Sequence, residues 1–91
     1  MSSHDEIVNW VYDAMLDNAT PLDIHIFKNH TEEDLVEYHQ TMGRYIRYEH
    51  ELWARKWTPE IGIDGVDYSP NHPDNYSIII IRDVWKKINE L

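Results

Sequence analysis

The chain has 91 residues, no cysteine and a formal net charge of −9, with 17 acidic side chains against 8 lysines and arginines. This length predicts one domain over residues 1–91 with one modest core, and the lack of cysteine excludes disulfides, thiol catalysis and thiolate metal sites. Because so negative a field repels phosphate backbones and anionic membranes, we expect no direct binding to long nucleic acid or to a membrane.

The first predicted helix runs from about His4 to Leu16. Ser3 and Glu6 have the spacing of a capping box at its start. An apolar stripe follows at helical spacing, formed by Ile7, Val8, Val11, Tyr12 and Met15. The residues that open the chain lack a basic segment followed by an apolar one, unlike a signal peptide, so we expect a protein of the bacterial or host cytoplasm.

A second, short helix is predicted from about Pro21 to Lys28. Thr20 suits its N-cap, and Pro21 suits its first turn. Residues 23–27 also alternate like a strand, but one short strand would have no partner, which favours the helix.

The third helix is predicted to be the longest, beginning after Thr31, with Leu35, Met42, Ile46 and Trp53 near one face. Thr31 and Asp34 resemble a capping box. Gly43 falls in its middle, where a glycine costs up to about 1 kcal/mol relative to alanine. We therefore expect either close packing or a bend at Gly43.

Residues 58–71 contain two prolines and two glycines and are predicted to form a long loop, with a short strand or hairpin over 61–66 as an alternative. The fourth helix is predicted from about Pro73 to Glu90. Its four isoleucines at 78–81 make it the expected centre of the core. The fold class predicted is all-α, a compact bundle of four helices, one of them short, with a long loop before the last helix.

Two segments together resemble an uncharacterised domain family of bacteria and their phages. The first joins Glu33-Asp34-Leu35 and Gly43-Arg44-Tyr45-Ile46-Arg47 to Leu52-Trp53. The second joins His72-Pro73-Asp74-Asn75-Tyr76-Ser77 to Ile79-Ile80 and Trp85. The resemblance covers roughly residues 31–88 and implies an all-α fold without an established activity. The chain departs from the family pattern at Tyr48, where the family has Asn, and at Glu51, where it often has Gly.

Arg44 and Arg47 are three residues apart, so they are neighbours on one helix face, and paired guanidinium groups suit a phosphate or carboxylate. The helix start at 72–77 adds free backbone N–H groups, which also favour an anion. The alternative is that the arginines pair with carboxylates such as Asp74 and that His72 only caps the helix. The predicted ligand-binding residues are Arg44, Arg47, Tyr48, Trp53, Trp57, His72, Asp74 and Ser77.

The tryptophans divide into two groups. Trp10, Trp53 and Trp85 lie on apolar helix faces and are predicted to be in the core, whereas Trp57 is the predicted exposed aromatic residue. The histidines and carboxylates lack the spacing of a metal site, so no metal or other cofactor is expected.

The sequence shows no nucleophile motif and no phosphate-binding glycine loop, so we do not expect an enzyme. Acid–base catalysis by His72 and Asp74 stays open as an alternative. The leading hypothesis is a non-enzymatic phage protein that sequesters a nucleotide-derived immune signal, as a homo-oligomer because one small subunit encloses such a ligand poorly. The alternatives are an acidic inhibitor that mimics nucleic acid and binds a basic host enzyme, and a structural accessory domain.

Overall fold

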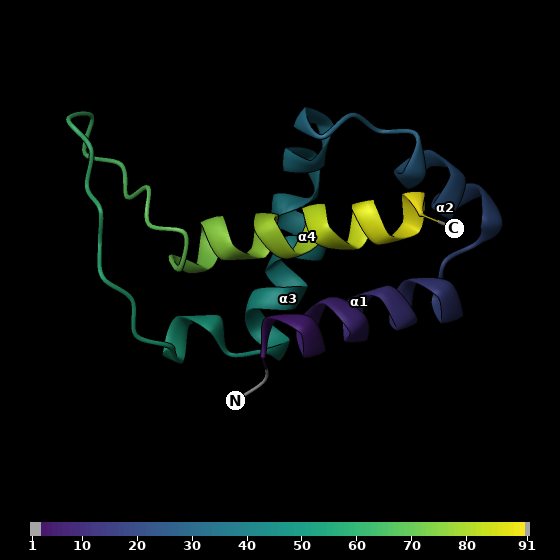
Figure 1. The fold of residues 1–91 in the computed structure, drawn as a ribbon, viewed down its shortest axis with the longest axis horizontal. Coiled ribbons are helices and arrows are strands. Elements are labelled where there is room, and N and C mark those ends of the chain that lie inside the picture. Colours follow the sequence, from purple (N-terminus) through teal and green to yellow (C-terminus); the bar gives the residue numbers. More distant parts are fainter. Residues whose placement is uncertain (1–2, 91) are drawn as a thin grey trace.

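The computed structural model describes residues 3–90, and these residues form helices joined by short turns and one long loop (Figure 1). The elements in chain order are α1 (His4–Asn18), α2 (Pro21–Lys28), η1 (Glu33–Tyr38), η2 (His39–Gly43), α3 (Arg44–Glu49), η3 (Leu52–Ala54) and α4 (Pro73–Asn89). Elements η1 and η3 are 3-10 helices, and η2 is a π-helix. The predicted all-α bundle with a long loop before its last helix is confirmed.

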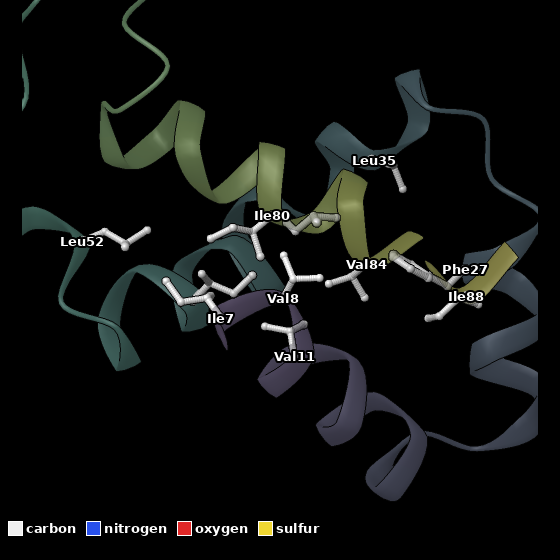
Figure 2. Close-up of a cluster of buried hydrophobic side chains, with 11 residues drawn as sticks. Ile7, Val8, Val11, Phe27, Leu35, Leu52, Ile80, Val84 and Ile88 are labelled. Atoms are coloured by element: carbon white, nitrogen blue, oxygen red, sulfur yellow. The ribbon is translucent and has the colours of Figure 1, made fainter. Parts of the chain in front are cut away.

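Helix α4 lies at the centre of the bundle, with α1 beside it and the segment from η1 to α3 crossing behind it (Figure 1). Valine and isoleucine side chains of α1 face those of α4 across the core, while α2, η1 and η3 close its ends (Figure 2). The buried apolar side chains are Ile7, Val8, Val11, Phe27, Leu35, Ile46, Leu52, Ile80, Ile81, Val84 and Ile88. Each such side chain stabilises the fold by roughly 1.5–3 kcal/mol relative to exposure, so the core of this small chain depends on every one of them.

The first three predicted helix starts have side-chain caps. Ser3 accepts a hydrogen bond from the backbone N–H of Glu6, and Thr20 forms a capping box before Pro21. At η1, the backbone N–H of Thr31 donates to Asp34 at 2.9 Å, and Asp34 N–H donates back to the Thr31 hydroxyl. These hydrogen bonds, the backbone one first, hold the pKa of Asp34 below its usual range.

The prediction of one long third helix is wrong, because the segment changes helical type twice before it ends. It passes from 3-10 to π to α geometry and then stops where Glu51 takes a left-handed φ of 50°. Arg47 donates to the carbonyl oxygen of His39 inside the π-helix at 3.0 Å. This hydrogen bond gives the irregular backbone a partner and so supports the change of helical type. The longest helix is instead α4, with 17 residues.

The segment between η3 and α4 extends away from the helices and returns to them (Figure 1). It carries a single antiparallel bridge between Ile61 and Asp67, with Gly65 in the left-handed turn at a φ of 80°. The hairpin alternative is thus realised only as this minimal bridge in the described chain. None of the helices in residues 3–90 combines the length and the apolar character required to cross a bilayer.

The expectation that Trp10 and Trp53 lie in the core is wrong. Trp10 is 37% exposed and Trp53 is 56% exposed. Trp10 instead stacks on Tyr45 of α3 with ring centroids 5.5 Å apart. Trp85 packs against the core as a partly buried side chain. The left-handed turn at Glu51 rotates Trp53 out of the apolar face that a continuous helix would have given it.

Candidate functional site

Arg47 connects the third helical segment to the start of α4. Its Nη1 donates to the Ser77 hydroxyl at 2.9 Å, and its Nε lies 3.7 Å from Oδ1 of Asp74. The side chain is buried, at 8% exposure for the residue. With the bond to the His39 carbonyl, the guanidinium has partners on three sides. One of the alternatives from the sequence, an arginine paired with Asp74, is therefore the arrangement present.

Gly43 and Ser77 make room for this arginine. A Cβ atom at Gly43 would lie 3.0 Å from Nη1 of Arg47 and 3.3 Å from the carbonyl oxygen of Tyr38. Ser77 donates its own hydroxyl proton to the carbonyl of Asp74 at 3.0 Å, which leaves its oxygen to accept from Arg47. We call Gly43, Arg47, Asp74 and Ser77 the arginine clamp, and it joins the third helical segment to the start of α4.

His72 caps α4 and packs within a group of rings. Its Nδ1 accepts the backbone N–H of Asp74 at 3.2 Å, and its ring contacts Trp53 and Trp57 edge-on, each with centroids 5.3 Å apart. Trp57 is half-buried and donates from Nε1 to Asp67 at 3.1 Å. The prediction that Trp57 is the exposed aromatic residue is wrong, because this hydrogen bond and the ring contacts hold it against the loop.

An open groove of about 590 Å³ lies along α3 and η3 next to the clamp. We call it the α3–η3 groove, and its lining residues are Arg47, Tyr48, Glu49, Glu51, Trp53 and Ala54. Tyr48 is 80% exposed, so it and Trp53 present the aromatic surface of the groove. Two carboxylates share that surface, while the one cation of the lining, Arg47, faces Asp74.

The structure groups the eight predicted ligand-binding residues unevenly. Arg47, Asp74 and Ser77 meet in the clamp, and Trp53, Trp57 and His72 meet in the group of rings. Tyr48 lines the α3–η3 groove. Arg44 is exposed and lies outside that lining, and its side chain makes no hydrogen bond or ion pair with residues 3–90. The guanidinium groups of Arg44 and Arg47 therefore do not lie side by side. That the predicted residues bind a ligand stays a prediction.

A second pocket, of about 280 Å³, lies between η3 and the start of α4 and was not predicted from the sequence. Its lining residues are Leu52, Arg55, Lys56, Asn71 and Tyr76. The adjacent pair Arg55 and Lys56 was a usable signal, because the chain has only 8 lysines and arginines. Nothing local in the sequence linked that pair to Tyr76.

No family model matches the chain, and comparison with curated proteins and with solved structures likewise gives no match. The resemblance to a family of bacteria and phages therefore stays a prediction from the residues that carry it.

Proposed function

We propose that this protein is a non-enzymatic binding module that docks a basic segment of a partner protein in the α3–η3 groove. One observation carries this proposal. The groove combines exposed Tyr48 and Trp53 with Glu49 and Glu51, while its only cationic side chain is already paired with Asp74.

Such a groove suits a lysine or arginine side chain. A cation over the face of tryptophan or tyrosine gains about 0.5–1 kcal/mol at exposed sites. Carboxylates beside the rings attract the same cation, and the net charge of −9 steers a basic partner toward the protein. This corresponds to the acidic inhibitor among the hypotheses drawn from the sequence, with a basic host enzyme as the expected partner.

The same geometry disfavours an anion at the residues expected from the sequence. Arg47 would have to release Asp74 or Ser77 to bind a phosphate, and losing a hydrogen bond made by a buried guanidinium is costly. Glu49 and Glu51 would also repel that phosphate. A nucleotide-derived ligand at Arg44 and Arg47 is thus the weaker hypothesis, and phage origin and homo-oligomer formation stay predictions.

Binding is also favoured over catalysis by His72 and Asp74. His72 uses Nδ1 to cap α4, and the carboxylate of Asp74 faces Arg47 and, at 4.0 Å, Nε2 of His39. Both groups of the predicted acid–base pair thus have structural partners.

The test is a titration of the full chain with a fluorescently labelled oligolysine peptide, followed by anisotropy. Replacing Glu49→Gln together with Glu51→Gln raises the net charge from −9 to −7, and we expect it to weaken binding about tenfold. Glu33→Gln with Glu37→Gln gives the same charge change on exposed residues of η1 outside the groove. This control should weaken binding by less than about twofold.

Tyr48→Ser supplies the aromatic arm of the experiment, because the exposed side chain is dispensable for folding. This substitution should weaken binding of the peptide about threefold without changing the net charge. The proposal would be overturned if both double glutamine variants lost the same affinity for the peptide, or if Tyr48→Ser lost none. Either result would mean that the peptide is attracted by the overall charge and does not bind in the groove.

A further inference from the structure

The pocket between η3 and α4 has the opposite charge character to the α3–η3 groove. Arg55 and Lys56 both line it, Asn71 adds an amide, and no carboxylate of residues 3–90 is in its lining. Its volume of about 280 Å³ is at the small end for ligand sites. In a chain with 17 acidic residues, two adjacent cations at one small pocket form a locally positive site on a negatively charged protein.

A chain of polar contacts holds the wall of this pocket in place. Asp83 lies 2.6 Å from Nε2 of His4, and Nδ1 of His4 lies 3.0 Å from the Tyr76 hydroxyl. Tyr76 is in turn hydrogen-bonded to the side chain of Arg55, whose guanidinium carbon lies 5.9 Å from the centre of the Tyr76 ring.

The chemistry of these groups sets the direction of two of the hydrogen bonds. Because the Asp83 carboxylate only accepts, Nε2 of His4 donates to it. Because a guanidinium only donates, the oxygen of Tyr76 accepts from Arg55. Burial raises the pKa of Tyr76, although Arg55 opposes this, so the phenol stays neutral. The result is an arginine held beside a neutral partner.

We propose that this pocket binds a phosphate group, either as inorganic phosphate or as the terminal group of a phosphate monoester. A guanidinium and an ammonium group from consecutive residues offer donors from two directions, which suits a tetrahedral oxyanion better than a planar carboxylate. The Asn71 amide adds a neutral donor, and Leu52 forms an apolar wall. The site is independent of the α3–η3 groove and uses other cations than the pair predicted from the sequence.

The experiment is a titration of the ¹⁵N-labelled full chain with inorganic phosphate at constant ionic strength, followed by amide chemical shifts. Saturable shifts are expected at residues 55, 56, 71 and 76. Lys56→Gln should weaken phosphate binding about tenfold. Arg44→Gln removes the same charge from an exposed residue outside the pocket and should change the phosphate affinity by less than about twofold. Arg55→Lys keeps the charge but loses the fork, and it should also weaken binding.

Adenosine monophosphate and adenosine separate the two sources of phosphate. Tighter binding of the monophosphate than of inorganic phosphate, with no shifts from adenosine, assigns the terminal group of a monoester, and equal binding assigns phosphate itself. Shifts with adenosine alone, equal losses in Lys56→Gln and Arg44→Gln, or no saturable shift near Tyr76 would overturn the site. None of these outcomes involves Tyr48 or the glutamates of the groove, so this test and the oligolysine test fail independently.

Discussion

The side chain of Arg47 spans from α3 to Ser77 of α4, residues 30 apart in the chain, and donates a buried 2.9 Å hydrogen bond to its hydroxyl. Asp74, the carbonyl oxygen of His39 and, at 3.4 Å, Nδ1 of His39 also contact the guanidinium. The arginine clamp therefore fixes where the central helix begins relative to the segment that crosses it.

We expect Arg47→Met to lower the free energy of unfolding by about 2 kcal/mol, because it leaves Ser77 and His39 without their donor. Arg47→Lys should recover little of this loss, since one ammonium group cannot reach partners on three sides. Urea denaturation measures both changes. Arg44→Met is the matched control and should stay within about 0.5 kcal/mol of the parent, and a similar loss at both arginines would contradict the clamp.

Gly43→Ala sets helix propensity against the space that Arg47 occupies. Alanine gains about 1 kcal/mol of propensity, but its Cβ would lie 3.0 Å from Nη1 of Arg47 and 3.3 Å from the backbone oxygen of Tyr38. We expect a net destabilisation of about 1 kcal/mol in thermal or urea unfolding. The loss should shrink when Arg47→Met is already present, which a double-mutant cycle detects. A stabilised Gly43→Ala protein would mean that the guanidinium moves aside freely.

Glu51→Gly should stabilise the fold by about 0.5–1 kcal/mol, because a side chain in the left-handed region is strained and glycine is not. Glu51 has a φ of 50°. Glu49→Gly removes the same charge at the last residue of α3, where a helical backbone still disfavours glycine, and should instead destabilise by up to about 0.5 kcal/mol. Opposite signs for these two neighbours in chemical denaturation are the outcome expected, and a destabilised Glu51→Gly would contradict it.

His50 predicts part of the pH dependence of stability. Burial of its ring, followed by repulsion from Arg55, lowers the pKa of His50 below 6.5, and its ring edge meets Trp10 at 4.8 Å. The unfolded chain thus binds more protons than the folded one just below pH 6.5, so this contribution to stability is lost as the pH falls through that value toward the folded pKa.

Titration of the His50 ring by NMR should give a midpoint below 6.5. His50→Phe keeps a ring beside Trp10 and removes the titration, so stability should fall less steeply with decreasing pH in the variant. An unchanged slope, measured by denaturation at several pH values, would assign the effect to other histidines.

Much of the fold was predictable because its signals are local. Thr20 and Pro21 define the start of α2, and Pro73 defines the start of α4, since caps and prolines act within one turn. The buried positions of α4 follow helical spacing, so Ile80 and Ile81 of the isoleucine run were correctly placed in the core.

The failures come from geometry that no local pattern encodes. Trp53 was assigned to the core because the helical spacing of the apolar residues was extended past Glu51. The backbone at Glu51 is in fact left-handed, so the helical spacing does not continue through it. For Arg47, the same residues fit either a ligand site or an internal ion pair, and only the fold brings Asp74 within 3.7 Å. The contact between His4 and Asp83 joins residues 79 apart, beyond the reach of any motif.

The three rings of Trp53, Trp57 and His72 tie the point where the long loop leaves the helices to the point where it returns. These ring contacts hold the two ends of the loop together. Each doubling of the loop's length would therefore add only about 0.6 kcal/mol to the entropic cost of closing it. Gly65, exposed at the tip, consequently offers an insertion point at which an epitope or a fluorophore tag can be displayed while the helices beneath keep their packing.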